Sequence, residues 1–183
     1  MANKPTPTQL EQLRTSIAGQ VILPGDADYD AARALMVAWI KKRPAAIVKV
    51  KNADDVIAVV NFCREHGVEL AVRSGGHSGA GHSSTNGGVV IDLSKMNAID
   101  IDVDDGTVWA EAGSKAGPLT HALAEHDFAV GFGDTGSVGI GGITLGGGVG
   151  YLVRKHGLTI DNLLAAEVVT ADGRLVPASA SEN

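Results

Sequence analysis

One short stretch of the chain combines the residue types needed to hold an anion. The sequence RSGGHS, residues 73–78, follows directly on the apolar run VELAV and precedes further glycines. Adjacent glycines allow several backbone N–H groups to converge on one point, and Arg73 and Ser78 offer further donors. The spacing therefore indicates an anion-binding turn. The alternative, a plain glycine turn with a surface histidine at His77, stays open from these residues alone.

A longer glycine-rich segment is the second candidate for binding. Ten of the 24 glycines fall between Gly131 and Gly150. The start of the segment matches G-x-G-x-x-G at Gly131, Gly133 and Gly136, but glycines continue where a dinucleotide fingerprint needs a helix to open. We therefore exclude a Rossmann-type site, and no G-x-x-x-x-G-K-[ST] loop occurs. A backbone wall packed along an extended ligand fits this segment better.

Metal and nucleophilic sites are not predicted. Residues 100–111, DIDVDDGTVWAE, imitate a calcium loop, but Asp105 stands where that loop needs glycine, and alternating apolar residues indicate a strand. The histidines lack metal-ligand spacing with a carboxylate or thiol partner. No G-x-S-x-G elbow is present, and nothing local marks a base for Ser137. The single cysteine, Cys63, lies in a helical pattern that favours a small buried side chain.

Composition limits the class of protein. The 183 residues are 44% hydrophobic with a net charge of -6, and the scattered basic residues argue against a nucleic-acid surface. No stretch approaches the roughly 20 apolar residues that span a bilayer, and the N-terminus lacks the apolar core of a signal peptide. We expect a folded cytoplasmic protein with neither nucleic acid nor membrane as partner.

Periodicity and cap residues predict the elements that position these segments. Helices are expected at 8–18 after a Thr8 cap, from 29 to a stop at Pro44, at 52–67 between an Asn52 cap and Gly67, and at 116–127. Strands are expected at 45–50, 68–76 and 87–94, and hairpins at 98–113 and 164–179 with turns at DDG and ADG. The first two strands flank a helix, so they should lie parallel or nearly adjacent.

These elements predict an α+β fold of two lobes. Residues 1–31 are expected to form an N-terminal helical extension, residues 32–86 a β-α-β lobe, and residues 87–183 a mostly antiparallel α+β lobe. The glycine-rich segments lie between or beside the lobes. Clefts between lobes are common places for a cofactor.

The chain resembles a known family in the order of its motifs. It is similar to the FAD-linked oxidases with a PCMH-type FAD-binding domain, the berberine-bridge-enzyme-like group, in RPAAIVKVKNADDV, VRSGGHS, GGVVIDLSKMNAIDID and GGITLGGGVGYLVRKHGLTIDNLLAAEVVTADGRL. The resemblance runs from about Ala32 to the C-terminus. It implies an oxidoreductase in which FAD takes a hydride at N5 from a C–H bond of a small-molecule substrate and O2 is the acceptor.

The resemblance also implies roles by position. His77 matches the histidine that is linked covalently to the 8α-methyl group of the flavin, and the backbone of residues 74–78 would wrap the diphosphate. Residues 135–142 would line the flavin and phosphates, Gly146 and Gly150 would permit close approach, and Val168 would lie by the adenine. The expected cofactor-binding residues are Arg73, Ser74, Gly75, Gly76, His77, Ser78, Thr135, Gly136, Ser137, Gly139, Gly141, Gly142, Gly146, Gly150 and Val168.

Two physical consequences are attached to these roles. Converging amide dipoles would balance the diphosphate without a lysine. A histidyl link would withdraw electrons from the flavin and raise its reduction potential. Many relatives carry a cysteine that makes a second flavin bond, and Thr135 stands at the matching position. The resemblance therefore implies a histidyl-only link.

The resemblance also implies that family members continue into a substrate domain that supplies the catalytic base. We therefore expect this chain to be a fragment holding most of the flavin domain, inactive alone, and no catalytic residue is predicted in it. Two alternatives stay open. The chain is a folded module that retains no FAD, or the parent protein is a flavin dehydrogenase with another electron acceptor.

Overall fold

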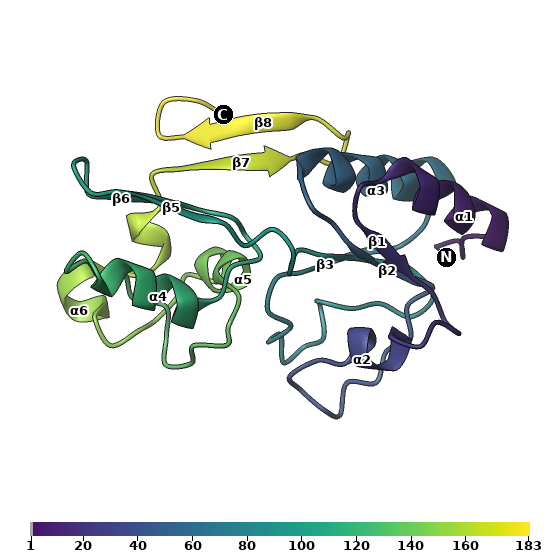
Figure 1. Cartoon of the computed structure of the whole chain (residues 1–183), viewed down its shortest axis with the longest axis horizontal. Helices are drawn as coiled ribbons and strands as arrows, with labels where there is room; N and C mark the ends of the chain where they lie inside the picture. Colours follow the sequence, from purple (N-terminus) through teal and green to yellow (C-terminus); the bar gives the residue numbers. More distant parts are fainter. Residues whose placement is uncertain (1) are drawn as a thin grey trace.

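The computed structural model describes residues 2–183 and confirms the α+β class. In chain order the elements are α1 (Pro7–Ser16), β1 (Gln20–Ile22), α2 (Tyr29–Arg33), β2 (Ala46–Lys49), α3 (Ala53–His66), β3 (Leu70–Arg73), β4 (Val89–Asp92), β5 (Ile99–Asp102), β6 (Thr107–Ala110), α4 (Ala116–Ala124), α5 (Ile140–Leu145), α6 (Val153–His156), η1 (Ile160–Asn162), β7 (Ala165–Val169) and β8 (Leu175–Ser179). Figure 1 shows one lobe around β1, β2 and β3 and another around β5, β6 and α4. None of the helices in the described residues is long and apolar enough to cross a membrane.

The first lobe is built on a four-stranded sheet in the order β1-β2-β4-β3. Strands β2, β4 and β3 run parallel, and β1 is antiparallel to β2. The predicted β-α-β unit is confirmed as β2-α3-β3, and β4 lies between its two strands. The carboxyl ends of three parallel strands therefore meet at one edge of the sheet, where RSGGHS begins.

Both faces of this sheet are buried, which explains its continuously apolar strands. On one face, Leu13 of α1 and Val59 of α3 belong to the same buried cluster as Val48. On the other face, Tyr29 of α2 packs with Ile47. Figure 1 accordingly shows α1 and α3 on one side of the strands and α2 on the other.

The first lobe is wider than the sequence predicted. Strands β1 and β4 both belong to its sheet, although β1 was expected in the extension 1–31 and β4 in the second lobe 87–183. All four residues of β4 are buried, because it is a central strand with neighbours on both sides. An apolar run of this kind does not reveal which lobe supplies its neighbours.

Two helices differ from their predicted bounds. Helix α1 is capped by Thr6 and not by Thr8: the Thr6 hydroxyl accepts from the Gln9 amide, and the Gln9 side chain accepts from the Thr6 amide. Pro7 then occupies the first turn, which a proline tolerates. Helix α2 ends at Arg33, and the expected continuation toward Pro44 is irregular. By contrast, α3 begins after its Asn52 cap and ends at His66, with Gly67 as the C-cap that stops it as predicted.

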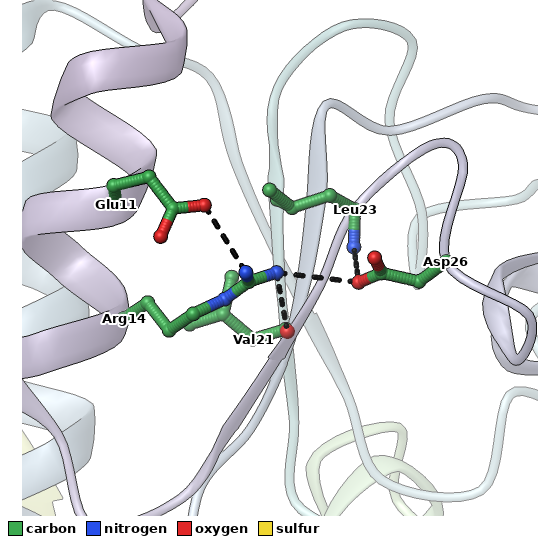
Figure 2. A network of polar contacts seen from close by, with 5 residues as sticks. All are labelled: Glu11, Arg14, Val21, Leu23 and Asp26. Atoms are coloured by element: carbon green, nitrogen blue, oxygen red, sulfur yellow. Dashed lines mark hydrogen bonds and ion pairs between the residues drawn. The ribbon is translucent and has the colours of Figure 1, made fainter.

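The start of the chain is tied to the sheet by one arginine, shown in Figure 2. Arg14 of α1 donates to the Glu11 carboxylate at 3.1 Å, to the Asp26 carboxylate at 3.3 Å and to the Val21 carbonyl at 3.4 Å. Asp26 in turn accepts from the Leu23 amide. The network joins α1 to β1 and to the turn that follows it.

The second lobe contains two hairpins and several short helices. Strands β5 and β6 pair antiparallel, as do β7 and β8, which confirms both predicted hairpins. Helix α4 buries Leu119 and Leu123 with Ile140 of α5 against residues of β5 and β6. The β7-β8 hairpin lies beside α3 in Figure 1, and Arg64 of α3 donates to the Asp172 carbonyl in its turn at 2.9 Å.

Candidate functional site

The RSGGHS segment forms a row of unpaired backbone amides at the end of β3. Strand β3 ends at Arg73, and Gly76 adopts a φ of 72°, a left-handed conformation that favours glycine. Within residues 2–183, the amides of Gly75, Gly76, His77 and Ser78 donate no hydrogen bond. Backbone amides inside a protein normally find a partner, so consecutive free donors are suited to an anionic ligand.

The irregular segment 34–43 supports this turn. Lys42 donates from Nζ to the Gly81 carbonyl at 2.9 Å. Leu35 lies beside the turn, because a Cβ at Gly76 would be 3.5 Å from its Cδ2 atom. The residues after α2 therefore pack against the glycine turn and the loop that follows it.

The Arg73 side chain makes most of its hydrogen bonds within the protein. Its Nη2 atom donates to the Asp92 carboxylate at 2.8 Å and to the Ala32 carbonyl at 2.6 Å. The ion pair is buried, since Arg73 is only 5% exposed. The other terminal nitrogen, Nη1, is buried and has no hydrogen-bond partner within residues 2–183. Nη1 is therefore available for the ligand-donor role expected of Arg73.

The two serine hydroxyls of the segment also have partners in the protein. Ser74 Oγ donates to the Ala112 carbonyl at 2.6 Å. Ser78 Oγ accepts from the His82 amide at 3.2 Å. The free donors of this segment thus include its backbone amides, Arg73 Nη1 and the Ser78 hydroxyl, whose oxygen only accepts in this contact.

The structure brings the two glycine-rich segments together. A Cβ on Gly75 would collide with the Gly139 backbone nitrogen, and a Cβ on Gly139 would collide with Gly75 and Ser74. Beside this contact, Ser137 Oγ lies 3.1 Å from His77 Nε2. The sequence predicted both segments as site candidates but not this direct contact between them.

Several of the predicted glycines serve contacts within the protein. At three of them an added Cβ would be crowded by backbone. On Gly136 it would lie 3.2 Å from Gly117, and on Gly141 it would lie 3.0 Å from the Ala112 carbonyl. On Gly150 it would lie 2.9 Å from the Gly133 nitrogen. Gly142 differs, because a Cβ there would meet nothing within 4 Å. The nearest atom to a Cβ on Gly146 is the Gly142 carbonyl, 3.4 Å away. The expected ligand wall is thus partly an internal packing surface.

Two predicted residues lie outside these contacts. Thr135 is exposed and donates from its hydroxyl to the Asp134 carboxylate at 3.1 Å. Val168 lies in β7, where it pairs with Val176 and is 41% exposed. No hydrogen bond within residues 2–183 joins Val168 to residues 73–78.

A cavity of about 230 Å³ opens at the carboxyl edge of the parallel strands. Lys49, Arg73 and Asp92, the last residues of β2, β3 and β4, line it together with Gly75 and Gly76. Ala31, Ala32, Ala34, Ser74, Ser94 and Lys115 complete its wall. Two of the lining residues, Lys49 and Lys115, were not predicted as site residues. A charged residue at the end of a buried strand, such as Lys49, is the signal that could have pointed to this edge.

Comparison with known proteins decides the family. An FAD binding domain family matches residues 44–179. The chain belongs to this family. It is 41% identical over 170 residues to an FAD-linked oxidoreductase of Bacillus subtilis. The aligned residues cover 92% of this chain and 38% of that protein. It is 36% identical over 155 residues to berberine bridge enzyme-like D-1 of Nicotiana tabacum, covering 81% of this chain and 27% of that protein.

Solved structures of FAD-linked oxidases share the fold. The crystal structure of 6-hydroxy-D-nicotine oxidase from Arthrobacter nicotinovorans matches with a TM-score of 0.91 and 36% identity, over 97% of this chain and 38% of that chain. Glucooligosaccharide oxidase from Acremonium strictum, described with a 6-S-cysteinyl, 8 alpha-N1-histidyl FAD, matches with a TM-score of 0.89 and 26% identity, over 95% of this chain and 37% of that chain. The chain thus spans less than two fifths of each of these relatives.

The residues present fit the cofactor that the family binds. The free amides of residues 75–78 suit a diphosphate, and the open space at Gly142 leaves room beside the second glycine segment. The cavity adds the positive charge of Lys49 and Lys115. Within residues 2–183, no group of three or more histidine, cysteine, aspartate or glutamate side chains is placed to hold a metal ion.

Proposed function

We propose that this chain is the FAD-binding portion of an oxidase whose flavin is attached through His77. FAD would supply the redox chemistry in such an enzyme, as the acceptor of a hydride from a substrate C–H bond, with O2 as the final electron acceptor. The substrate is a small molecule, and the residues described here bind and orient the cofactor.

One observation carries this proposal: His77 lies within the row of free backbone amides at residues 75–78, and its side chain contacts Ser137 of the second glycine segment. Amides that hold a diphosphate would place the rest of FAD along residues 135–142 and within reach of the imidazole. The Ser137 contact occupies Nε2 of His77. Nδ1 is therefore the ring nitrogen left free, and the histidyl FAD of glucooligosaccharide oxidase supports a link of this kind.

We further propose that His77 is the only point of attachment. A second bond of the 6-S-cysteinyl type needs a sulfur atom, and Thr135 offers a hydroxyl at the matching position. The only cysteine, Cys63, is buried in α3 within the first lobe's core. Burial raises the pKa of its thiol to about 12, so it is not a reactive thiolate at neutral pH.

The test is flavin retention after denaturation. We expect the purified chain to be yellow, and the colour to stay with the polypeptide after acid precipitation. His77→Ala should release the flavin on unfolding, whereas His82→Ala, an exposed histidine of the same loop, should retain it. Colour released from the unsubstituted chain would refute the covalent link but leave FAD binding intact.

A second candidate is a folded module that does not retain FAD on its own. Leu145 and Tyr151, which flank the last glycines of the second segment at 146–150, are 84% and 88% exposed. Such exposure fits a surface that another part of a longer protein covers. The same purification decides between the two candidates, because folded but colourless protein would favour this one.

A further inference from the structure

The loop that leads from His77 to strand β4 begins with two successive turns. Ser78 accepts two hydrogen bonds in the first turn, one on its carbonyl from the Gly81 amide at 3.1 Å and one on its hydroxyl from the His82 amide at 3.2 Å. In the second turn the Ser84 amide donates to the Gly81 carbonyl at 3.3 Å. The backbone next to His77 is therefore fixed only as well as these two turns are.

One ammonium group joins both turns to the segment that precedes β2. Lys42 Nζ donates to the Gly81 carbonyl at 2.9 Å and to the Ser84 carbonyl at 3.0 Å. Both bonds are charge-assisted, and they are stronger than bonds between neutral groups because the Lys42 side chain is half-buried. Ile40 packs beside them, since a Cβ at Gly81 would lie 3.1 Å from its Cγ2 atom. A single side chain thus holds the first part of the loop.

Backbone bonds fix the far end of the loop separately. The Arg43 amide donates to the Asn86 side chain at 2.9 Å, and the Gly87 amide donates to the Arg43 carbonyl at 2.9 Å. Neither bond involves the Lys42 side chain. Loss of the ammonium group should therefore loosen the part of the loop nearest His77 and leave its connection to β4 in place.

The closed loop also holds three hydroxyl groups in an unfavourable environment. Ser83, Ser84 and Thr85 are 6%, 3% and 0% exposed, and their hydroxyl oxygens have no hydrogen-bond partner within residues 2–183. Buried polar groups without a partner cost free energy that water would recover on opening. The closed loop therefore depends on contacts that oppose opening, and the two bonds from Lys42 are contacts of this kind.

We propose that Lys42 is a positioning residue for flavin attachment, because it holds residues 78–84 closed and so fixes the backbone of His77 while Ser137 orients the ring. This inference rests on the proposed function. Attachment forms a C–N bond between His77 and the 8α carbon of the flavin and breaks one C–H bond of the methyl group and one N–H bond of the imidazole. The two electrons and two protons released reduce O2 to hydrogen peroxide. Lys42 acts on this step only through the loop.

The first experiment separates the binding of FAD from its attachment. The rate of covalent incorporation into the flavin-free chain is measured against FAD concentration in Lys42→Met, Lys42→Arg and Lys41→Met. Methionine keeps the apolar stem of Lys42 and removes its charge. Lys41 is the matched control, because its side chain is exposed and carries the same charge.

We expect Lys42→Met to lower the maximal rate of attachment about tenfold, as the loss of a charge-assisted hydrogen bond does, at an unchanged half-saturating concentration of FAD. Lys42→Arg should restore the rate, because a guanidinium group can donate to two carbonyls. Equal maximal rates in Lys42→Met and Lys41→Met would overturn the proposal. So would a lost rate that Lys42→Arg does not restore.

The second experiment measures amide hydrogen exchange in the flavin-free chain. The amides of Gly81, His82 and Ser84 should exchange about tenfold faster in Lys42→Met than in Lys41→Met, whereas the amides of β2 should exchange equally in both and so report a folded chain. Equal exchange in the loop would overturn the proposal. If the unsubstituted chain attaches no flavin, the covalent link of the proposed function is refuted, and exchange alone then decides whether Lys42 holds the loop.

Discussion

At the scale of single residues, the contact between Ser137 and His77 has a chemical consequence. When Nε2 carries the ring hydrogen and donates it to Ser137 Oγ, the lone pair of Nδ1 is free to form a bond. When the hydroxyl donates to Nε2 instead, Nδ1 carries the hydrogen and cannot. We propose that Ser137 Oγ accepts from Nε2, which leaves Nδ1 unprotonated and able to form the bond.

Replacing this serine should therefore slow flavin attachment without preventing it. We expect Ser137→Ala to lower the covalently bound fraction about fivefold at a fixed time, the effect of one hydrogen bond of about 1 kcal/mol, and Ser137→Thr to restore it. In-gel flavin fluorescence measures the fraction, and nitrogen NMR of the flavin-free chain measures the tautomer. Equal incorporation with an unchanged tautomer would show that the contact is incidental.

At the scale of elements, the glycines of the second segment have two different roles: some pack against protein backbone and others leave space for a ligand. Gly139→Ala should destabilise the protein by about 1–3 kcal/mol, because its Cβ would collide with backbone that cannot move aside cheaply. Gly142→Ala should leave stability nearly unchanged, since its Cβ meets nothing. Urea unfolding measures both.

The effect of Gly142→Ala should instead appear when FAD binding is measured. Gly142→Ala fills space that we propose for the cofactor, so it should weaken FAD binding although the chain remains fully folded. A Gly142→Ala variant with unchanged FAD affinity would place the cofactor elsewhere along the second segment. Loss of stability in Gly142→Ala would instead give this glycine a structural role.

The same elements show which parts of the fold a sequence reveals. Helix α3 was predictable because the Asn52 cap and the left-handed Gly67 lie at its own ends. The early end of α2 was not, because the residues after it are held by contacts such as Lys42 with the Gly81 carbonyl, far along the chain. The lobe of β4 likewise depends on strand neighbours that no local pattern names.

Only part of the candidate site was likewise predictable from the sequence. The glycine pair and His77 stand out in the sequence because their types are unusual at one place. The cavity lysines do not, since Lys49 and Lys115 become neighbours only when the sheet edge and the start of α4 fold together. Nor does the sequence reveal that Arg73 is bound to Asp92 and that Gly150 packs on Gly133.

At the scale of the whole molecule, Cys63 offers a reporter of how cofactor binding and folding are coupled. It is the only cysteine, it is 3% exposed, and burial raises the pKa of its thiol to about 12. A thiol reagent attacks the thiolate, so labelling requires that α3 leave the sheet. That opening breaks the core beneath the strands whose ends form the cavity.

FAD should therefore slow the labelling of Cys63. If the first lobe opens as one unit, reversible FAD binding at 100 times its Kd stabilises the closed state by about 2.7 kcal/mol and slows labelling about 100-fold. The measurement is the labelling rate of His77→Ala against FAD concentration, with riboflavin as the ligand that lacks the diphosphate. If saturating FAD leaves the labelling rate of Cys63 unchanged, α3 opens locally while the cofactor stays bound. The dependence on FAD thus distinguishes a lobe that unfolds cooperatively from one whose helix α3 moves independently of the site.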